Sequence, residues 1–491
     1  MKLSYLAQQA APYTQSVHGD CEISSLMQDS RIRAENSLFF CISGIRSDAH
    51  DFIPQAIQNG ATAVVITREI PGLSVPYILV DNDRAAMALI AAAFYGHPAR
   101  SLRMVGITGT KGKTTVSYYV KAILETAGIA CGLIGTTGSM IGDKWMKNTL
   151  TTPDPIELQQ TLRAMVDANV QAVCMEVSAH AIAMHRLEGI VFEASCFTNL
   201  SQDHLDFFGT MDAYFAAKCQ FFTEEHTRNA AINLDDDRAG TLIERLHIPY
   251  STFGIWQKSD IFARDIEMNE GGVNFNLVLW NEQVYPVHLR MMGMFSVYNA
   301  LAAVAIGLIM GVTPPDICRA LESVRAVPGR AEVLETNTPF KVVLDYSHTP
   351  SALSNILETV RGFVRNRIIV VFGCGGDRDH GKRPMMGEIA GRLADYSVLT
   401  SDNPRSEDPM EILSAIEAGI QPTGAAYVKI ENRREAIRHA LEQAEDGDVV
   451  ILAGKGHETY QEIRGTKRPF DEKLIVHDLL SAIAEERKNN A

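Results

Sequence analysis

The sequence predicts an α/β protein of three domains, in which a central parallel sheet of the P-loop ATPase type lies between two further α/β domains. Runs of β-branched and aromatic residues alternate with helical periodicity along most of the 491 residues. At about 150 residues per domain this length gives about three domains. A Gly- and Thr-rich loop also stands between a strand and a helix at residues 105–115. We expect domains at 1–100, 101–329 and 330–491, because residues 96–101 and 327–330 interrupt the pattern.

Composition excludes several classes of protein. A hydrophobic fraction of 46% with 21% charged residues is typical of a soluble globular chain. The net charge of −14 argues against nucleic acid as a partner, since binding to a phosphate backbone needs an excess of Lys and Arg. Residues 1–9 lack the apolar core of a signal peptide, and no apolar run is long enough to span a bilayer. We therefore expect a cytoplasmic protein without membrane insertion, whose eight cysteines are reduced packing residues.

The first domain shows strand patterns at residues 37–42, 63–66 and 77–80 and helical periodicity at 51–59 and 83–95. Ser30 lies between Asp29 and Arg31 on a loop before the first of these strands. Its hydroxyl, with the neighbouring guanidinium, would suit a phosphate group, and a solvated turn is the alternative.

The loop at residues 105–115 reads VGITGTKGKTT and predicts a phosphate-binding loop. Gly109 and Gly112 would let backbone N–H groups close around an anion. Lys113 would reach the terminal phosphates and the Thr114 hydroxyl would bind Mg²⁺. The strict pattern has glycine where this chain has Ile107, so the loop is a variant, and an ordinary Gly-rich turn is the alternative.

In the rest of the central domain we expect strand and helix to alternate throughout residues 102–328. The strand at 170–177 carries Glu176 near its end and is followed by Ser178, and the strand at 194–199 is followed by Asp203 and His204. Because ligands bind beyond the carboxyl ends of parallel strands, we predict a magnesium site here. His204 could be a ligand or a surface histidine. Asn299 begins a strongly apolar helix and is its one plausible ligand contact.

The last domain shows strands at 341–344, 368–372, 396–400 and 449–452. Each one ends in a polar cluster, at residues 345–350, 373–379, 401–405 and 454–458. Four polar strand ends on one sheet predict a binding site.

Five of these motifs resemble those of the Mur ligases of peptidoglycan synthesis: residues 106–115, 176–178, 199–204, 345–348 and 402–405. The resemblance runs through all three domains in order. It implies a UDP-binding N-terminal domain, a central ATPase domain and a Rossmann-like C-terminal domain that binds the incoming amino acid. It also implies that ATP and Mg²⁺ serve to join meso-2,6-diaminopimelate to UDP-N-acetylmuramoyl-L-alanyl-D-glutamate through an acyl phosphate. We expect the enzyme to be a monomer.

The resemblance assigns roles to individual residues of this chain. It implies that ATP is bound by Thr110, Lys111, Gly112, Lys113, Thr114, Thr115, Asn299, Arg330 and Asp345. It implies catalytic roles for Lys113, Glu176, His204, Lys218 and His348, and Mg²⁺ binding by Thr114, Glu176, His204 and Lys218. Whether His348 and Asp345 orient the nucleotide or the attacking amine is left open.

Substrate contacts follow from the same resemblance. The uridine nucleotide and the muramoyl-peptide match Ser30, Ile45, Arg46, Ser47, Thr151, Thr152, Ser178 and Arg186. Related sequences often carry Gln where this chain has Met184. The amino acid matches Arg378, Asp402, Asn403, Pro404, Arg405, Gly454 and Glu458. We expect a buried Arg405 to bind the far carboxylate of diaminopimelate, which lysine lacks.

Lys218 has two interpretations. By sequence alone it is a lysine that extends from a half-buried helix face into solvent. The resemblance instead matches it to a lysine carbamylated by CO₂, which would turn a cation into an anion able to help bind Mg²⁺.

Two other functions are compatible with parts of the sequence. A folylpolyglutamate synthase-like ligase shares the variant P-loop but is not expected to show Asp-Asn-Pro-Arg at 402–405. A P-loop switch or motor needs only the central domain. A ligase makes ADP in step with an amide, whereas a switch makes ADP without an amine.

Overall fold

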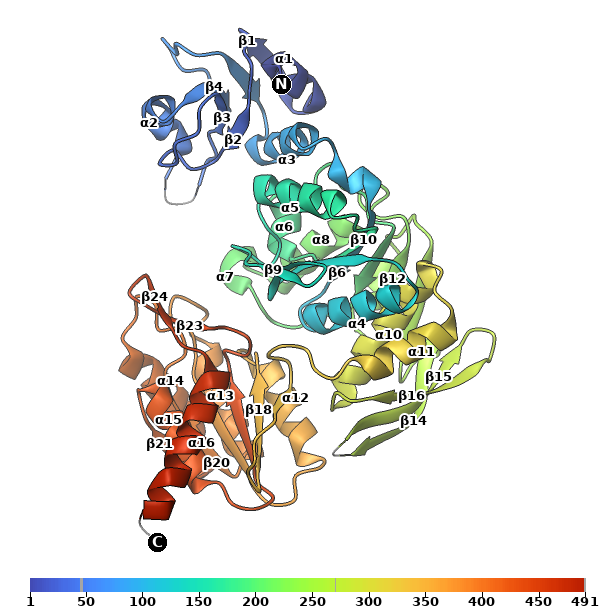
Figure 1. Cartoon of the computed structure of the whole chain (residues 1–491), viewed down its shortest axis with the longest axis vertical. Helices are drawn as coiled ribbons and strands as arrows, with labels where there is room; N and C mark the ends of the chain where they lie inside the picture. Colours follow the sequence, from blue (N-terminus) through green and yellow to red (C-terminus); the bar gives the residue numbers. More distant parts are fainter. Residues whose placement is uncertain (45–46, 270, 490–491) are drawn as a thin grey trace.

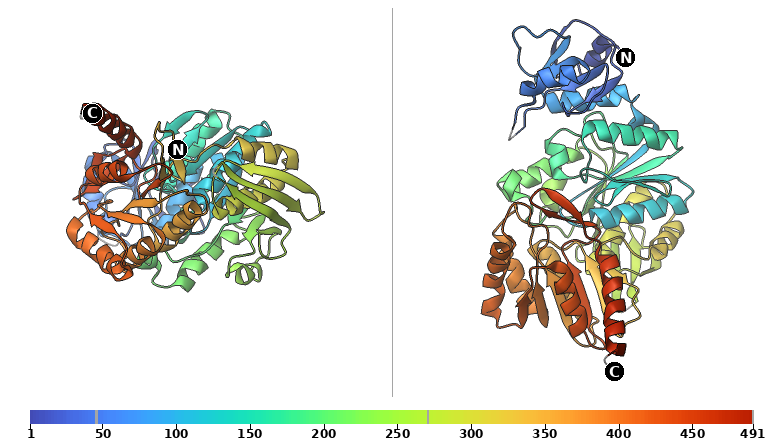
Figure 2. Two further views of the ribbon diagram at one scale, coloured as in Figure 1. Left: turned by 90° about the horizontal axis from the view of Figure 1, so that it is seen from below. Right: turned by 60° about the vertical axis from the view of Figure 1, so that its left-hand side comes forward.

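The computed structural model describes residues 1–44, 47–269 and 271–489. Within this part, three main sheets follow one another along the chain and lie in a row (Figure 1). The N-terminal and C-terminal domains lie at opposite ends of the central one, and the right-hand view of Figure 2 shows the same arrangement. We propose domain boundaries after residues 100 and 329, in the connections that lead from one sheet to the next.

The N-terminal domain is a five-stranded sheet in the order β1-β5-β4-β3-β2, parallel except for the β1–β5 pair. Its elements are α1 (Leu3–Gln9), β1 (Thr14–His18), β2 (Ser25–Met27), β3 (Ser37–Phe40), α2 (Ile53–Gln58), β4 (Ala61–Ile66), β5 (Tyr77–Val80) and α3 (Asp83–Phe94). The strands expected near 37, 63 and 77 are confirmed. β1 was not expected, because most of its residues are exposed and it lacks an apolar alternation.

The central domain is built on an eleven-stranded sheet in the order β16-β15-β14-β13-β12-β11-β6-β10-β7-β8-β9. Its strands are β6 (Arg103–Thr108), β7 (Cys131–Gly135), β8 (Gly138–Ile141), β9 (Lys144–Met146), β10 (Ala172–Glu176), β11 (Ala194–Phe197), β12 (Ala230–Asn233), β13 (Tyr250–Gly254), β14 (Ile261–Asn269), β15 (Gly272–Leu279) and β16 (Val284–Leu289). Its helices are α4 (Lys113–Thr126), α5 (Pro155–Asp167), α6 (Ala179–Ala183), α7 (Leu205–Phe208), α8 (Met211–Cys219), α9 (Ala239–Ile243), α10 (Met294–Ile309) and α11 (Pro314–Ser323). β6 pairs in parallel with both β10 and β11, so the P-loop and the polar ends of these two strands lie at one edge.

The expectation that strand and helix alternate through the whole central domain is wrong at both edges of this sheet. β14, β15 and β16 form an antiparallel meander without intervening helices, and β7, β8 and β9 form a second one. The inner face of the first meander is buried against α10 and α11. Because α10 and α11 already cover this face, a further helix would have no second apolar face of the sheet to cover. Antiparallel strands form this edge of the sheet instead.

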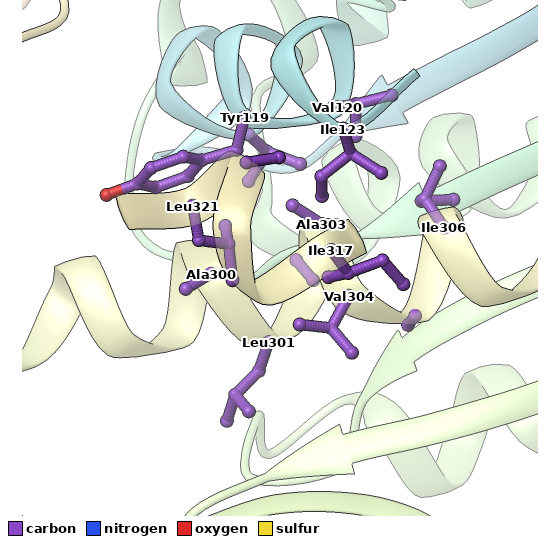
Figure 3. Packing of buried hydrophobic residues seen from close by; sticks show 14 of the residues in the cluster. Tyr119, Val120, Ile123, Ala300, Leu301, Ala303, Val304, Ile306, Ile317 and Leu321 are labelled. Carbon is purple, nitrogen blue, oxygen red and sulfur yellow. The ribbon is translucent and has the colours of Figure 1, made fainter. Parts of the chain in front are cut away.

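The predicted apolar helix is α10, and it is the centre of the largest core cluster. Side chains of α4, α10 and α11 point toward one another there, as the labelled Ile123, Ala303 and Ile317 illustrate (Figure 3). A Cβ at Gly307 would lie 3.0 Å from Ile123 and from Ile317, so the glycine allows the three helices to approach. This packing fixes the start of α4, and with it the P-loop.

The Ile123→Ala variant is expected to lower the free energy of unfolding by about 3 kcal/mol, since it leaves a cavity in this core. Ile123 is fully buried. Urea unfolding of the variant and the unmodified protein measures the difference. Met268→Ala is the matched control, because Met268 is 49% exposed on the far end of β14 and its loss should cost less than about 0.5 kcal/mol. Equal losses in the two variants would contradict the assignment of this core.

The C-terminal domain is a six-stranded sheet in the order β17-β18-β22-β19-β20-β21, in which only β17 is antiparallel. Its elements are β17 (Glu332–Leu334), β18 (Lys341–Asp345), α12 (Pro350–Arg361), β19 (Ile368–Phe372), α13 (Lys382–Leu393), β20 (Tyr396–Leu399), α14 (Pro409–Ile420), β21 (Tyr427–Lys429), α15 (Arg433–Gln443), β22 (Val449–Ala453), the separate hairpin β23 (Tyr460–Ile463) and β24 (Thr466–Pro469), and α16 (Glu472–Asn489). The four expected strands are confirmed. In the described ranges, none of the helices has the length and apolar character needed to cross a membrane.

Candidate active site

The loop after β6 has the close approaches that require glycine. A Cβ at Gly109, where φ is 146°, would lie 1.9 Å from Thr198 Oγ1. A Cβ at Gly112, where φ is 87°, would lie 2.4 Å from Asn299 Oδ1. Asn199 fixes the loop from β11, because its carbonyl accepts from Thr110 N at 2.9 Å and its side chain accepts from Lys111 N at 2.9 Å. The loop is therefore held in one conformation by its neighbours and is not an ordinary Gly-rich turn. Asn299 lies against it as expected.

Lys113 and the hydroxyls of Thr114 and Thr115 begin α4 directly after this loop. The Lys113 Nζ donates to the carbonyls of Gly109 at 2.8 Å and Thr110 at 3.1 Å. These bonds hold the cation inside the loop, beside backbone N–H groups at a helix N-terminus. That combination is suited to phosphate oxygens.

Arg330 connects the C-terminal domain to the P-loop. Its guanidinium donates to Thr114 Oγ1 at 2.9 Å and lies 4.8 Å from the ring centroid of Tyr346. Asp345 fixes the segment beside it, since the carboxylate accepts from Ala331 N at 2.7 Å and from the Ser347 hydroxyl. Asp345 thus acts here on the linker that carries Arg330. The ring of His348 donates to the Tyr346 carbonyl at 2.8 Å, so it belongs to the same strand end.

Glu176 ends β10 and is 1% exposed. Its two carboxylate oxygens accept from the backbone N–H of Thr136 at 2.9 Å and from its hydroxyl at 3.0 Å. Thr136 was missed by sequence reasoning, although it directly follows β7. The rule that polar residues at parallel strand ends form sites would have found it.

His204 and Lys218 both lie near the ring of Tyr214. The His204 ring centroid lies 5.8 Å from that of Tyr214 and 4.7 Å from that of His180. Partial burial, with the charges of His180 and Lys113, lowers the pKa of His204, which favours the neutral ring that binds metals. The Lys218 ammonium lies 4.6 Å from the centroid of the Tyr214 ring.

Lys218 is 1% exposed, so the interpretation as a lysine reaching into solvent is wrong. Burial, and then the charge of Lys113, lower the pKa of Lys218 well below its ordinary value. Among the described residues no carboxylate forms an ion pair with it. A buried amine that is deprotonated more easily than usual is the form that reacts with electrophiles.

Within the described ranges, no three His, Cys, Asp or Glu side chains converge closely enough to form a metal cage. Mg²⁺ seldom uses such cages in nucleotide sites, where one or two carboxylates and the phosphates bind it together with water. The carboxylate of Glu176, the Thr114 hydroxyl and the neutral His204 fit that type of site. An oxygen anion on Lys218 would add to the same donor set.

The residues expected to bind the muramoyl-peptide meet between β10 and α5. The Thr152 hydroxyl donates to the Glu176 carbonyl at 2.8 Å and accepts from Ser178 N at 3.0 Å. Arg186 donates to the Thr152 carbonyl at 2.9 Å and is 2.8 Å from Asp154. The Thr151 hydroxyl lies 3.2 Å from that of Thr136.

The sulfur of Met184, where related sequences often carry Gln, lies 3.7 Å from the Arg186 guanidinium. In the N-terminal domain the Ser30 hydroxyl donates to Gln55 at 2.8 Å, and the Ser47 carbonyl accepts from Gly44 N at 3.0 Å. Ile45 and Arg46 lie outside the described residues.

The strand ends of the C-terminal sheet form one network. Asn403 donates to Glu458 at 2.9 Å, and Asp402 approaches Gly454, where a Cβ would be 2.4 Å from its Oδ2. Lys455 is fully buried and donates to Asn403 and to Glu458, at 3.2 Å each. Lys455 is a residue that sequence reasoning missed. The signal that identifies Lys455 is the burial of its charge inside the polar cluster. Burial cannot be read from the sequence.

Arg405 is not buried as expected, because its side chain is 25% exposed. Its backbone, with φ of 51°, pairs with Ile463 of β23, and this turns the side chain along the hairpin. The guanidinium donates to the Gly376 carbonyl at 2.7 Å, which fixes it more than Pro404 does. Arg378 is 53% exposed, and its guanidinium lies 3.9 Å from Asp206 of the central domain. Both arginines border Gly375.

Comparison with known proteins matches this arrangement domain by domain. Family models described as the Mur ligase family catalytic domain, the Mur ligase middle domain and the Mur ligase glutamate ligase domain match residues 22–95, 107–307 and 329–456. A protein of Geobacillus thermodenitrificans is 43% identical over 99% of this chain and 100% of its own length. It is named UDP-N-acetylmuramoyl-L-alanyl-D-glutamate–2,6-diaminopimelate ligase. The chain belongs to the Mur ligase family.

Further members agree with this placement. A protein of the same name from Caldanaerobacter subterraneus is 45% identical over 94% of this chain and 95% of its own length. A solved structure of that name has a TM-score of 0.67 at 32% identity and covers 94% of this chain and 95% of the other. In this Mur ligase, Arg330 connects the glutamate ligase domain, whose match begins at residue 329, to the P-loop of the middle domain.

Proposed function

We propose that this Mur ligase uses ATP to join meso-2,6-diaminopimelate to UDP-N-acetylmuramoyl-L-alanyl-D-glutamate in peptidoglycan synthesis. The observation that carries the proposal is the 2.9 Å bond from Arg330 to Thr114, which brings the polar strand ends of the C-terminal sheet to the P-loop. An ATP site and an amino-acid site then face one reaction centre. The names of the relatives support these substrates.

Two steps would make the amide. A carboxylate of the muramoyl-peptide attacks the γ-phosphorus of ATP, the bond to the β-phosphate oxygen breaks, and ADP departs. The product of this step is an acyl phosphate. The amine of diaminopimelate then attacks the acyl carbon, loses a proton and expels phosphate. Lys113 and the α4 N-terminus would stabilise the negative charge of the first step. Bound Mg²⁺ would supply further positive charge between the two anions.

We propose that Mg²⁺ is held by Thr114, Glu176, His204 and Lys218, the last as a carbamate. The neutral Lys218 amine would add to the carbon of CO₂ and release a proton, which leaves an anionic carbamate. The buried amine with its lowered pKa supports this step. His348 and Asp345 would help through the linker that positions Arg330.

The muramoyl-peptide would extend from the N-terminal domain to Glu176. We propose that Ser30, Ile45, Arg46 and Ser47 bind its uridine nucleotide. Its peptide end would meet Thr151, Thr152, Ser178 and Arg186, which adjoin the reaction centre. We further propose that the enzyme acts in the cytoplasm as a monomer, with no nucleic acid partner.

An assay of ADP release against a panel of amino acids tests the proposal. ADP should form only when the muramoyl-peptide and a suitable amino acid are both present, in step with the amide. ADP formed without any amine would favour a P-loop switch. Turnover with folate and glutamate would favour a folylpolyglutamate synthase-like ligase.

The amino acid itself provides a sharper prediction. Diaminopimelate should support at least about a hundredfold higher kcat/KM than L-lysine, roughly 2.7 kcal/mol of discrimination. The reason is that the Arg405 guanidinium loses its carboxylate partner when lysine binds, whereas Arg378 would hold the carboxylate that both amino acids carry. Because Arg405 is partly exposed, part of that loss is compensated by water.

The Arg405→Ala variant should lose most of its activity with diaminopimelate and so reduce the ratio of the two amino acids. Arg392→Ala is a control on the same domain, because this surface arginine is 69% exposed and pairs only with Glu388 in the described chain. Equal use of both amino acids by the unmodified enzyme, or an unchanged ratio in the Arg405 variant, would refute the assignment.

A further inference from the structure

The loops that follow β20 and β22 contain the proposed amino-acid site, but these strands are not neighbours, because β19 lies between them. The β20 loop crosses over the end of β19, where a Cβ at Gly373 would lie 2.0 Å from the Thr400 carbonyl. It then reaches the β22 loop at Gly454, beside Asp402. Strand pairing alone therefore does not fix the distance between the two loops.

Arg433 contacts both of these loops and holds them together. It is the first residue of α15 and is 1% exposed. One amino group of its guanidinium donates to the Ala453 carbonyl at 2.9 Å, and the other lies 3.5 Å from the Ser401 carbonyl. These two carbonyls belong to the residues directly before Gly454 and Asp402.

Glu472 holds the guanidinium in this orientation. Its carboxylate accepts from Arg433 Nε at 2.7 Å, and Glu472 is also 1% exposed. The planar guanidinium group of arginine has donors on several sides and can bond two carbonyls and a carboxylate at once. The ammonium group of lysine cannot do so in the same geometry. A buried ion pair adds little net stability compared with apolar residues of similar volume, so another role is needed to explain it.

We infer that Arg433 is a positioning residue for the amino-acid site, which sets the spacing of the Asp402 and Gly454 loops while Glu472 orients it. This rests on the proposed function, since those loops are the proposed binding site for diaminopimelate. Arg433 does not touch the substrate. Its effect should therefore appear in the binding of the amino acid and not in that of ATP.

The Arg433→Lys variant tests the role of the guanidinium group, because it keeps the positive charge beside Glu472 but cannot bond both carbonyls. We expect its KM for diaminopimelate to rise about tenfold, with the KM values for ATP and the muramoyl-peptide within about twofold of the unmodified enzyme. The double variant Arg433→Met with Glu472→Leu removes both charges and should show the same selective rise. Thermal unfolding of each variant checks that the domain folds.

Arg367→Met is the matched control in the same sheet. Arg367 pairs with Asp448 at 2.7 Å at the amino ends of β19 and β22, away from the proposed site. Its loss should leave all three KM values unchanged. A normal KM for diaminopimelate in folded Arg433→Lys, or an equal rise in all three KM values, would overturn the inference. An unmodified enzyme that uses no amino acid would instead refute the proposed function.

Discussion

The Lys113→Ala variant is expected to lose at least about a thousandfold in kcat, roughly 4 kcal/mol of barrier. Lys113 lies within the P-loop, where its ammonium would meet the phosphates of ATP as negative charge moves during phosphoryl transfer. Folding should be preserved, because the hydrogen bonds that the side chain makes are to loop carbonyls and, among the described residues, it is not part of an apolar core cluster. ADP release under saturating substrates measures kcat, and circular dichroism checks the fold.

Lys121→Ala is the control for this variant. Lys121 lies two turns further along the same α4 helix and pairs with Glu125. Its loss should leave turnover within about twofold. If Lys113→Ala retained activity within about tenfold, or roughly 1.4 kcal/mol, the phosphate role of Lys113 would be wrong.

The Lys218→Ala variant is expected to be at least about a hundredfold less active and to be partly restored by added formate or acetate. A small carboxylate could occupy the space left by the proposed carbamate and supply the same negative charge near Lys113 and His204. Removing a group that positions a metal costs losses of this order. Activity with and without the added carboxylate measures the rescue.

Two further measurements separate the carbamate from a purely structural lysine. ¹³C-labelled bicarbonate should give a carbamate NMR signal in the unmodified enzyme that is absent from Lys218→Ala. Lys113→Ala should not be rescued by carboxylate, because its missing charge is positive. Normal activity of Lys218→Ala without rescue, or no carbamate signal in the unmodified enzyme, would refute the carbamate.

Much of the fold could be predicted from local pattern. The strands β6, β10, β18 and β22 are continuous apolar runs bounded by polar clusters, and such runs identify parallel strands that are buried on both faces. The antiparallel meander β14 to β16 could not be predicted in the same way. Its half-exposed strands depend on pairing partners and on a face of α10 and α11 that only the assembled domain provides.

The same distinction between local pattern and tertiary contact applies to the candidate active site. Short motifs indicate which residues carry the chemistry, because the glycines of the P-loop and the polar residues at strand ends are set by backbone geometry close in sequence. Burial and orientation are not local. Lys218 is enclosed although its helix has little amphipathic character, and Arg405 is partly exposed because a hairpin about sixty residues later pairs with its backbone.

Short-range patterns in the chain suffice to predict the three α/β units, the P-loop, the polar strand ends and the family resemblance. Which of these parts meet depends on how the domains fold and pack. Arg330 reaches Thr114 across a domain boundary, Thr136 holds Glu176 from a neighbouring strand, and Arg433 joins two loops whose strands are not adjacent. The physical reason is that local preferences depend on a few neighbouring residues, whereas burial and these hydrogen bonds depend on groups far apart in the chain that meet only when the sheets pack.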